Sequence, residues 1–217
     1  MGNNQPSARK KTYYISLAIL AGMFFIFGFV SWVNSILIPY FRISCELTHF
    51  ESYFVAFAFY IAYFVMAIPS GILLKKVGFK KGIMYGFMLT ALGAFIFVPA
   101  ALARQFEIFL IGLFSIGTGL AILQTAANPY VTVLGAPETA PRRLNLAQSF
   151  NGLGAFIAAM FLSKLILSGT HYTRETLPVD YPGGWQAYIQ VETDAMKFPY
   201  LMLALLLVII AVVFIFS

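Results

Sequence analysis

The segment Ile108–Pro137, IFLIGLFSIGTGLAILQTAANPYVTVLGAP, runs for 30 residues without a charged side chain. A hydrocarbon core about 30 Å thick requires roughly 20 mainly apolar residues for each helix that crosses it. The segment meets that length, so we predict a membrane-spanning helix here. Further charge-free segments of similar length cover Thr12–Phe41, Ser52–Leu74, Gly82–Ala103, Leu144–Ser163 and Phe198–Ser217. The sequence therefore predicts an all-α membrane protein with six transmembrane helices.

The composition lies outside the range of ordinary soluble domains. The chain is 60% hydrophobic and 10% charged, whereas soluble domains carry about 25% charged residues. Its net charge of +6 is sorted among the loops rather than gathered in one patch, so we expect no nucleic-acid partner. Long apolar runs also favour helices over a barrel, whose strands would alternate over about ten residues.

The charges of the predicted loops indicate the orientation of the chain. Nine basic residues flank one side, and five lie on the other together with seven of the eight acids. Because cytoplasmic loops carry the Lys/Arg excess, we predict a cytoplasmic N-terminus in a bacterial inner membrane. The layout is a cytoplasmic tail (1–11) and a bundle (12–217) with spans at about 14–40, 52–74, 82–103, 107–135, 144–167 and 198–217, and an external loop at 168–197.

An internal repeat supports a division into two groups of three spans. The first span contains NSILIPY (34–40) and the fourth contains QTAANPY (124–130), which share an amide, a hydroxyl, a proline and a tyrosine at the same spacing. A chance match over so short a stretch is the alternative. Repeats of three plus three spans with inverted topology build the halves of many transporters.

Neutral polar residues are the functional candidates, because no Asp, Glu, Lys, Arg or His lies within the six charge-free segments. We therefore expect no enzymatic activity and no metal site. A buried amide without a partner costs several kcal/mol, so these groups must bond to another helix, to water in a cavity or to a ligand. Amides beside aromatic rings suit a neutral sugar, whereas simple bonding between helices is the alternative. The candidates for binding a sugar are Phe27, Ser31, Trp32, Asn34, Ser35, Gln124, Asn128, Gln148 and Asn151.

The loop after the second span is the other candidate. It carries Gly71 and Gly78 together with Lys75, Lys76, Lys80 and Lys81. These cations either anchor the loop on the cytoplasmic side or cap helix C-termini at a tight glycine turn and stabilise one conformation.

These segments resemble the major facilitator superfamily. The stretch 71–81 is similar to its signature Gly-x3-Asp-Arg-x-Gly-Arg-Arg/Lys, with Lys75 in place of the usual acid. The segments beginning at Asn34 and Gln124, and LNLAQSFN (144–151), resemble the fucose permease group of sugar symporters over nearly the whole chain. The resemblance implies the N-terminal half of a transporter, with a C-terminal six-helix half as its partner in the lipid bilayer.

Two positions separate the chain from proton-coupled fucose permeases. Ser35 and Gln124 stand where that group has aspartate and glutamate, so the chain looks more like the glucose/galactose branch. The resemblance also puts Phe27 at a pocket tryptophan and matches Gln148 and Asn151 to polar residues of span five. We therefore predict hexose transport by alternating access as a cation symporter, with Na⁺ or H⁺ as the coupling ion and no other cofactor. The alternatives are an L-fucose or amino-sugar transporter, a uniporter, and a truncated membrane protein that does not transport.

Overall fold

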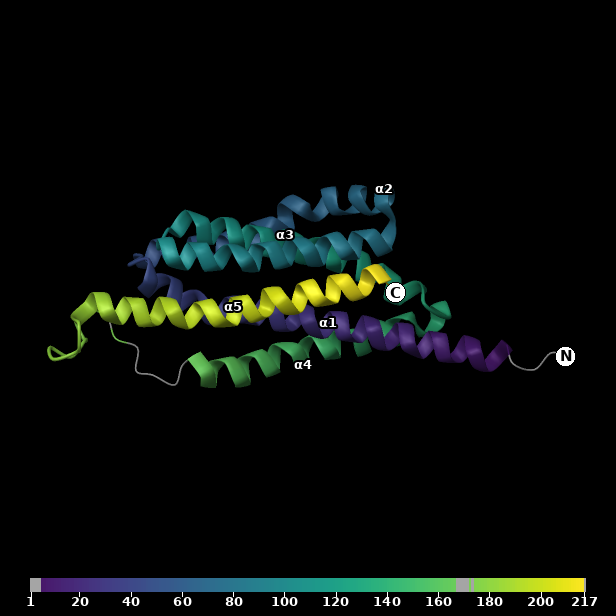
Figure 1. The fold of residues 1–217 in the computed structure, drawn as a ribbon. Helices are drawn as coiled ribbons and strands as arrows, with labels where there is room; N and C mark the ends of the chain where they lie inside the picture. The colour runs from purple at the N-terminus through teal and green to yellow at the C-terminus, as the bar shows by residue number, and fades with distance from the viewer. Residues whose placement is uncertain (1–4, 167–171, 173, 217) are drawn as a thin grey trace.

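The chain folds into an elongated bundle of helices that run side by side (Figure 1). The computed structural model describes residues 5–166, 172 and 174–216, and within these residues it contains no β-strand. Its elements are α1 (Gln5–Ser44), α2 (His49–Ala103), α3 (Phe106–Val133), the short 3₁₀ helix η1 (Pro137–Thr139), α4 (Ala140–Ile166) and α5 (Gly184–Phe216). The all-α prediction is confirmed.

The 55-residue helix α2 holds two of the predicted spans. Its backbone leaves helical geometry at Gly78, where φ is 80° and ψ is 165°. This region of backbone space is essentially restricted to glycine, so Gly78 separates a first leg (49–77) from a second leg (79–103). The predicted glycine turn is therefore present, and the described residues form six long helical segments in all.

Four helices of the described chain are long and apolar enough to cross a membrane: residues 12–35, 50–100, 106–133 and 184–212. The break at Gly78 divides the second of these into two legs. Helix α4 is less apolar because Asn145, Gln148 and Asn151 interrupt its hydrophobic residues. Two of these three residues, Gln148 and Asn151, are candidates for binding the sugar.

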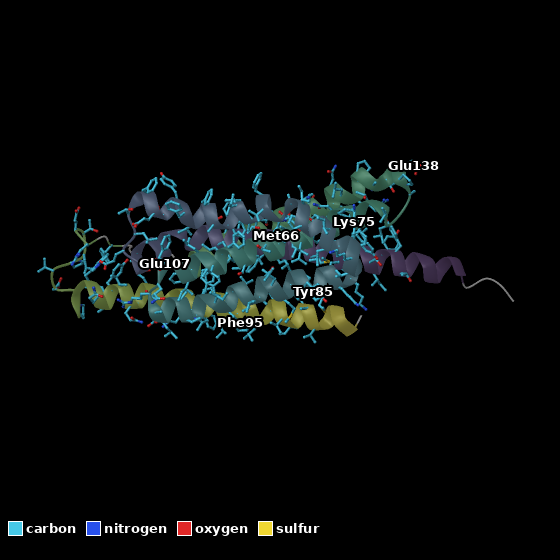
Figure 2. All side chains as sticks on the ribbon, turned by 90° about the horizontal axis from the view of Figure 1, so that it is seen from above. Met66, Lys75, Tyr85, Phe95, Glu107 and Glu138 are labelled. Carbon is cyan, nitrogen blue, oxygen red and sulfur yellow. The ribbon has the colours of Figure 1, made fainter. Side chains whose placement is uncertain are left out.

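The connections divide between the two ends of the bundle. The N-terminus, the C-terminus and η1 lie at one end in Figure 1. Lys75 and Glu138 lie at that end, and Glu107 lies at the other (Figure 2). Loops that the sequence assigned to opposite sides of the membrane therefore lie at opposite ends of the molecule.

Two helices extend beyond the predicted spans. Helix α1 already begins at Gln5, within the predicted tail. Helix α5 begins at Gly184, so residues 184–197 are helical rather than part of the external loop. Side chains from neighbouring turns hold this extension: Trp185 Nε1 donates to Glu46 Oε1 at 2.7 Å, and Arg104 donates to Gln186 and Gln190 at 3.0 and 2.6 Å. Residues 1–4, 167–171, 173 and 217 lie outside the described part.

Close backbone contacts join the helices in pairs. A Cβ atom on Gly154 of α4 would lie 2.0 Å from the Phe25 carbonyl oxygen of α1, and one on Gly28 would lie 1.9 Å from the Asn151 carbonyl oxygen. A Cβ atom on Gly119 of α3 would lie 2.6 Å from the Gly86 carbonyl oxygen of α2. Small residues permit this approach between membrane helices. The pairing brings α1 against α4 and α2 against α3.

Candidate functional site

A polar cluster joins three helices in the middle of the bundle. Gln124 Nε2 on α3 donates a hydrogen bond to the Tyr63 hydroxyl on α2 at 3.3 Å. The side chain of Ser31 on α1 lies close to the same hydroxyl. All three residues are half-buried. The structure thus brings together two predicted site residues, Ser31 and Gln124, through a third that sequence reasoning missed.

The local sequence explains how Tyr63 reaches Gln124. A Cβ atom on Gly117, two turns before Gln124, would lie 2.5 Å from the Phe59 carbonyl oxygen and 2.9 Å from the Ala62 Cβ. Only glycine allows α2 and α3 to approach this closely. The Phe59 ring packs edge-on against the Tyr63 ring, with the ring centroids 5.7 Å apart. Tyr63 is therefore held by packing as well as by its hydrogen bonds.

Helix α4 brings two further amides beside α1. The backbone of Asn151 lies against Gly28, one turn before Ser31. The Asn151 side chain is half-buried, and Gln148, one turn earlier on α4, is exposed. Residues three or four apart share one face of a helix, so Gln148 and Asn151 lie along one face of α4. The α1–α4 contact therefore positions the fifth-span candidates near the Ser31 turn.

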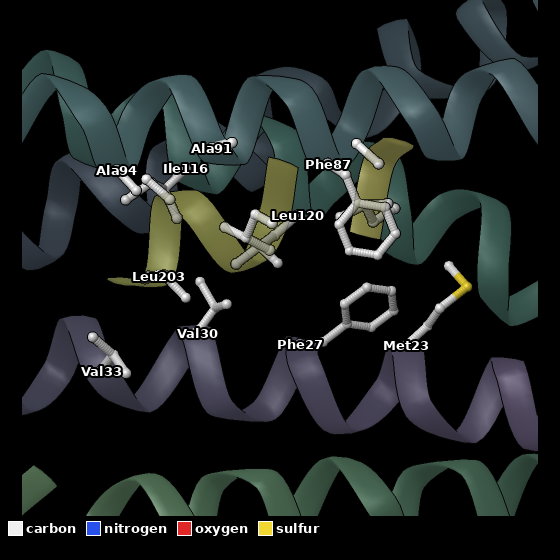
Figure 3. Close-up of a cluster of buried hydrophobic side chains, with 14 of the residues drawn as sticks. Met23, Phe27, Val30, Val33, Phe87, Ala91, Ala94, Ile116, Leu120 and Leu203 are labelled. Carbon is white, nitrogen blue, oxygen red and sulfur yellow. The ribbon is translucent and has the colours of Figure 1, made fainter. Parts of the chain in front are cut away.

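Asn34 and Phe27 occupy the interior of the bundle instead. Asn34 Nδ2 donates to the Val30 carbonyl oxygen at 3.0 Å, and the Tyr200 hydroxyl of α5 donates to Asn34 Oδ1 at 2.9 Å. Phe27 is fully buried, and its ring faces Phe87 in the hydrophobic core (Figure 3). The structure does not bring these two side chains to the surface with the other candidates.

The remaining candidates differ in their exposure. Trp32 is 49% exposed, so it has an open ring face for stacking, which the buried Phe27 lacks. Ser35 is exposed, and its hydroxyl donates to the Ser31 carbonyl oxygen at 3.3 Å. Asn128 Oδ1 is buried and has no hydrogen-bond partner within the described part of the chain. An unpaired oxygen at this depth costs about 1–3 kcal/mol, and a bound hydroxyl or water would remove that cost.

The predicted conformational loop forms the bend of α2. Lys75, Lys76, Lys80 and Lys81 are all exposed there, and none forms an ion pair with another described residue. No atom lies within 4 Å of a Cβ atom placed on Gly71. The proposed capping role of the four lysines stays a prediction.

Sequence reasoning also missed the role of Arg143. This residue is 3% exposed, and its Nε and Nη2 donate to the carbonyl oxygens of Val131 and Thr132 at 3.0 and 2.7 Å. Its Nη1 donates to the Ala136 carbonyl oxygen and to the Thr139 hydroxyl. The sequence held a weak signal for both missed residues, Tyr63 and Arg143. A mid-span tyrosine needs a partner for its hydroxyl, and a cation just after a helix can cap that helix.

Fold and site together define a class of protein. Long apolar helices that bury uncharged polar groups between them are typical of integral membrane proteins. The profile of the Major Facilitator Superfamily matches residues 20–217. The chain therefore belongs to the Major Facilitator Superfamily and is a membrane protein.

Relatives of known role support this assignment. The chain is 40% identical to a glucose/galactose transporter of Brucella abortus biovar 1 (strain 9-941), over 96% of this chain and 47% of the relative. It is also 40% identical to the L-fucose-proton symporter of Escherichia coli (strain K12), over 96% of this chain and 48% of the relative. The chain thus spans about half the length of the curated relatives it matches. These relatives are transporters and not enzymes.

A solved structure shows the same arrangement of helices. The crystal structure of FucP, a Major Facilitator Superfamily transporter, in the outward conformation matches with a TM-score of 0.82 and 40% sequence identity. The match covers 94% of this chain and 50% of FucP. The helices described here correspond to the N-terminal half of that fold.

Proposed function

We propose that this chain is the N-terminal half of a hexose transporter that works by alternating access. The observation that carries the proposal is the uncharged cluster of Ser31, Tyr63 and Gln124, which joins three helices of a Major Facilitator Superfamily bundle. Amide and hydroxyl groups both donate and accept hydrogen bonds, as sugar hydroxyls do. Trp32, which follows Ser31 on α1, adds an exposed aromatic ring.

The sugar is proposed to be glucose- or galactose-like. The relatives include glucose/galactose transporters as well as L-fucose-proton symporters. The neutral Ser35 and Gln124 favour the glucose/galactose branch. Competition of labelled glucose uptake by galactose, L-fucose and N-acetylglucosamine discriminates between these sugars, and strong inhibition by L-fucose alone would contradict the assignment.

Coupling to a cation is the second part of the proposal. Ser35 and Gln124 do not exchange protons near neutral pH, so proton coupling requires an acid on the second half of the transporter. Coupling to Na⁺ has no such requirement. Uptake into proteoliposomes under an imposed H⁺ or Na⁺ gradient, each applied alone, identifies the ion. Equal uptake without any gradient would establish a uniporter.

The position in the cell follows from the charges at the two ends of the bundle. We propose a bacterial inner membrane with the lysine-rich bend of α2 and the N-terminus in the cytoplasm, since cytoplasmic loops carry the Lys/Arg excess. A C-terminal six-helix half is proposed as the partner that completes the sugar cavity, because transporters of this architecture bind substrate between their halves.

Substitution of Gln124 tests the sugar site. In the complete transporter, Gln124→Ala removes the bond to Tyr63 and an acceptor for the sugar, so we expect hexose uptake to fall about five- to tenfold. Amounts of protein in the membrane should not change. Gln105→Ala is the matched control, because this exposed glutamine at the start of the same helix makes no capping hydrogen bond. Uptake that is unchanged in Gln124→Ala would overturn the site.

A further inference from the structure

We propose that Tyr63 is a positioning residue that orients the Gln124 amide, so that its carbonyl oxygen accepts a hydrogen bond from a sugar hydroxyl. The inference rests on the proposed function, and it adds that the site selects a hydroxyl group that donates a hydrogen bond. Tyr63 would act through Gln124 and Ser31, on either side of its hydroxyl.

The orientation of an amide side chain needs an external constraint. The terminal torsion of glutamine is broad, so an unconstrained Gln124 can present either its nitrogen or its oxygen to a ligand. Here Nε2 donates to the Tyr63 hydroxyl at 3.3 Å. The other end of the amide, Oε1, therefore faces away from Tyr63.

The carbonyl oxygen of Gln124 is free to accept. Three buried side-chain oxygens lack a hydrogen-bond partner within the described residues, and they belong to Ser70, Thr118 and Asn128. Gln124 Oε1 is not among them and makes no hydrogen bond in the described part of the chain, so it remains accessible. An accessible acceptor favours a ligand group that donates, such as a hydroxyl.

The Tyr63 hydroxyl is itself held in place. The Phe59 ring packs against the Tyr63 ring, and the close contact at Gly117 joins α2 to α3 within two turns of Gln124. The Ser31 side chain of α1 lies close to the hydroxyl on a third helix. Loss of this hydroxyl should therefore release the amide without disturbing the backbone around it.

The test uses the complete transporter in proteoliposomes. We expect Tyr63→Phe to raise the KM for glucose about fivefold, the effect of one lost hydrogen bond, with an unchanged maximal rate and an unchanged melting temperature. Deoxyfluoro-glucoses, each with one hydroxyl replaced by fluorine, report the specificity because fluorine cannot donate. The wild type should discriminate most strongly against one of them, and Tyr63→Phe should lose most of that discrimination.

Two further variants separate positioning from structure. Tyr85→Phe is the matched control, because Tyr85 lies on the same helix, is exposed and has no hydrogen bond in the described part of the chain. Coupled residues show non-additive effects, so Tyr63→Phe should cause no further rise in KM when Gln124 is already alanine.

The outcomes distinguish the inference from the proposed function. A wild-type transporter that takes up no hexose overturns both. Hexose uptake by the wild type with an unchanged KM in Tyr63→Phe overturns the positioning role alone. A lower melting temperature and maximal rate at constant KM would show that Tyr63 is structural, and that result also overturns the inference.

Discussion

Arg143 shows how this bundle holds a buried charge without an acidic partner. Its guanidinium donates to three carbonyl oxygens and one hydroxyl between Val131 and Thr139, at and beyond the C-terminal end of α3. The last carbonyl groups of a helix have no partner within the helix and carry partial negative charge. The cation therefore compensates the end of α3 and fixes the connection to α4.

Removal of Arg143 should destabilise the end of the bundle that carries η1. We expect Arg143→Ala to cost about 2–4 kcal/mol of stability, because several charge-assisted hydrogen bonds are lost and buried carbonyl groups are left unpaired. Thermal unfolding of the detergent-solubilised transporter measures the effect. Arg142→Ala is the control, since Arg142 is exposed. Equal melting temperatures for the two variants would contradict the capping role.

Individual side chains set the limit of sequence-based prediction of the site. The amides of Gln124, Gln148 and Asn151 were identifiable because they interrupt apolar segments. Their partners were not, because a bond such as Asn34 to Tyr200 depends on how α1 and α5 are rotated against each other. Tyr63 was missed for the same reason.

At the level of elements, glycine positions decide which helices pair. Gly28 and Gly154 let the backbones of α1 and α4 touch, and Gly86 and Gly119 do the same for α2 and α3. Sequence periodicity shows which residues share a face, but it does not show which neighbouring helix that face will meet. The helix lengths were therefore predictable, whereas the pairing required the structure.

A comparison within α4 tests this packing. Gly154→Ala places a Cβ atom 2.0 Å from the Phe25 carbonyl oxygen, so α1 and α4 must separate. We expect a loss of about 1–3 kcal/mol, measured as a lower melting temperature of the complete transporter. Gly152→Ala is the matched control, because nothing lies within 4 Å of its added Cβ atom. A melting temperature that falls equally in both variants would refute the contact.

Element boundaries were less predictable where polar residues continue a helix. The first turns of α5 contain Gln186, Gln190, Glu192 and Asp194, which read as loop by hydropathy. Bonds from Arg104 to Gln186 and Gln190, and from Trp185 to Glu46, hold these turns in helical form beyond the apolar segment. Such long-range partners are invisible to a local reading of the sequence.

For the whole molecule, charge-free run length was enough to predict the fold class. The six apolar segments of spanning length correspond to six helical segments. The distribution of lysines among the loops predicted which loops share an end of the bundle. The assignment to one half of a transporter came from motif resemblance, and the superfamily match supports it. The orientation of the bundle in its membrane remains a prediction.

Labelling of single cysteines tests that orientation. In cells with a Cys45→Ser background, an impermeant maleimide should label Val179→Cys directly and Lys76→Cys only after permeabilisation. Both positions are exposed, and they lie in loops assigned to opposite sides. The reverse pattern would invert the topology.

The native Cys45 thiol should itself react slowly with a maleimide in the folded protein. Burial, and then the nearby Glu107 carboxylate, raise the pKa of its thiol to about 12. The reactive thiolate is therefore scarce at neutral pH and increases as the pH rises toward that value. The rate of Cys45 labelling in denatured protein should be half-maximal near pH 9, the ordinary pKa of the thiol, whereas in the folded protein the rate should keep rising at higher pH. A plateau at the same pH in both states would contradict the burial.

The glycine contacts between α1 and α4, and between α2 and α3, have a mechanical consequence. At these glycines the two backbones are in contact, with no side chain between them. The paired helices therefore cannot slide along each other without a steric clash. Each of these two pairs would then move as one stiff unit. Under the proposed function, exposure of a sugar first to one side of the membrane and then to the other would require these pairs to tilt against the proposed C-terminal half.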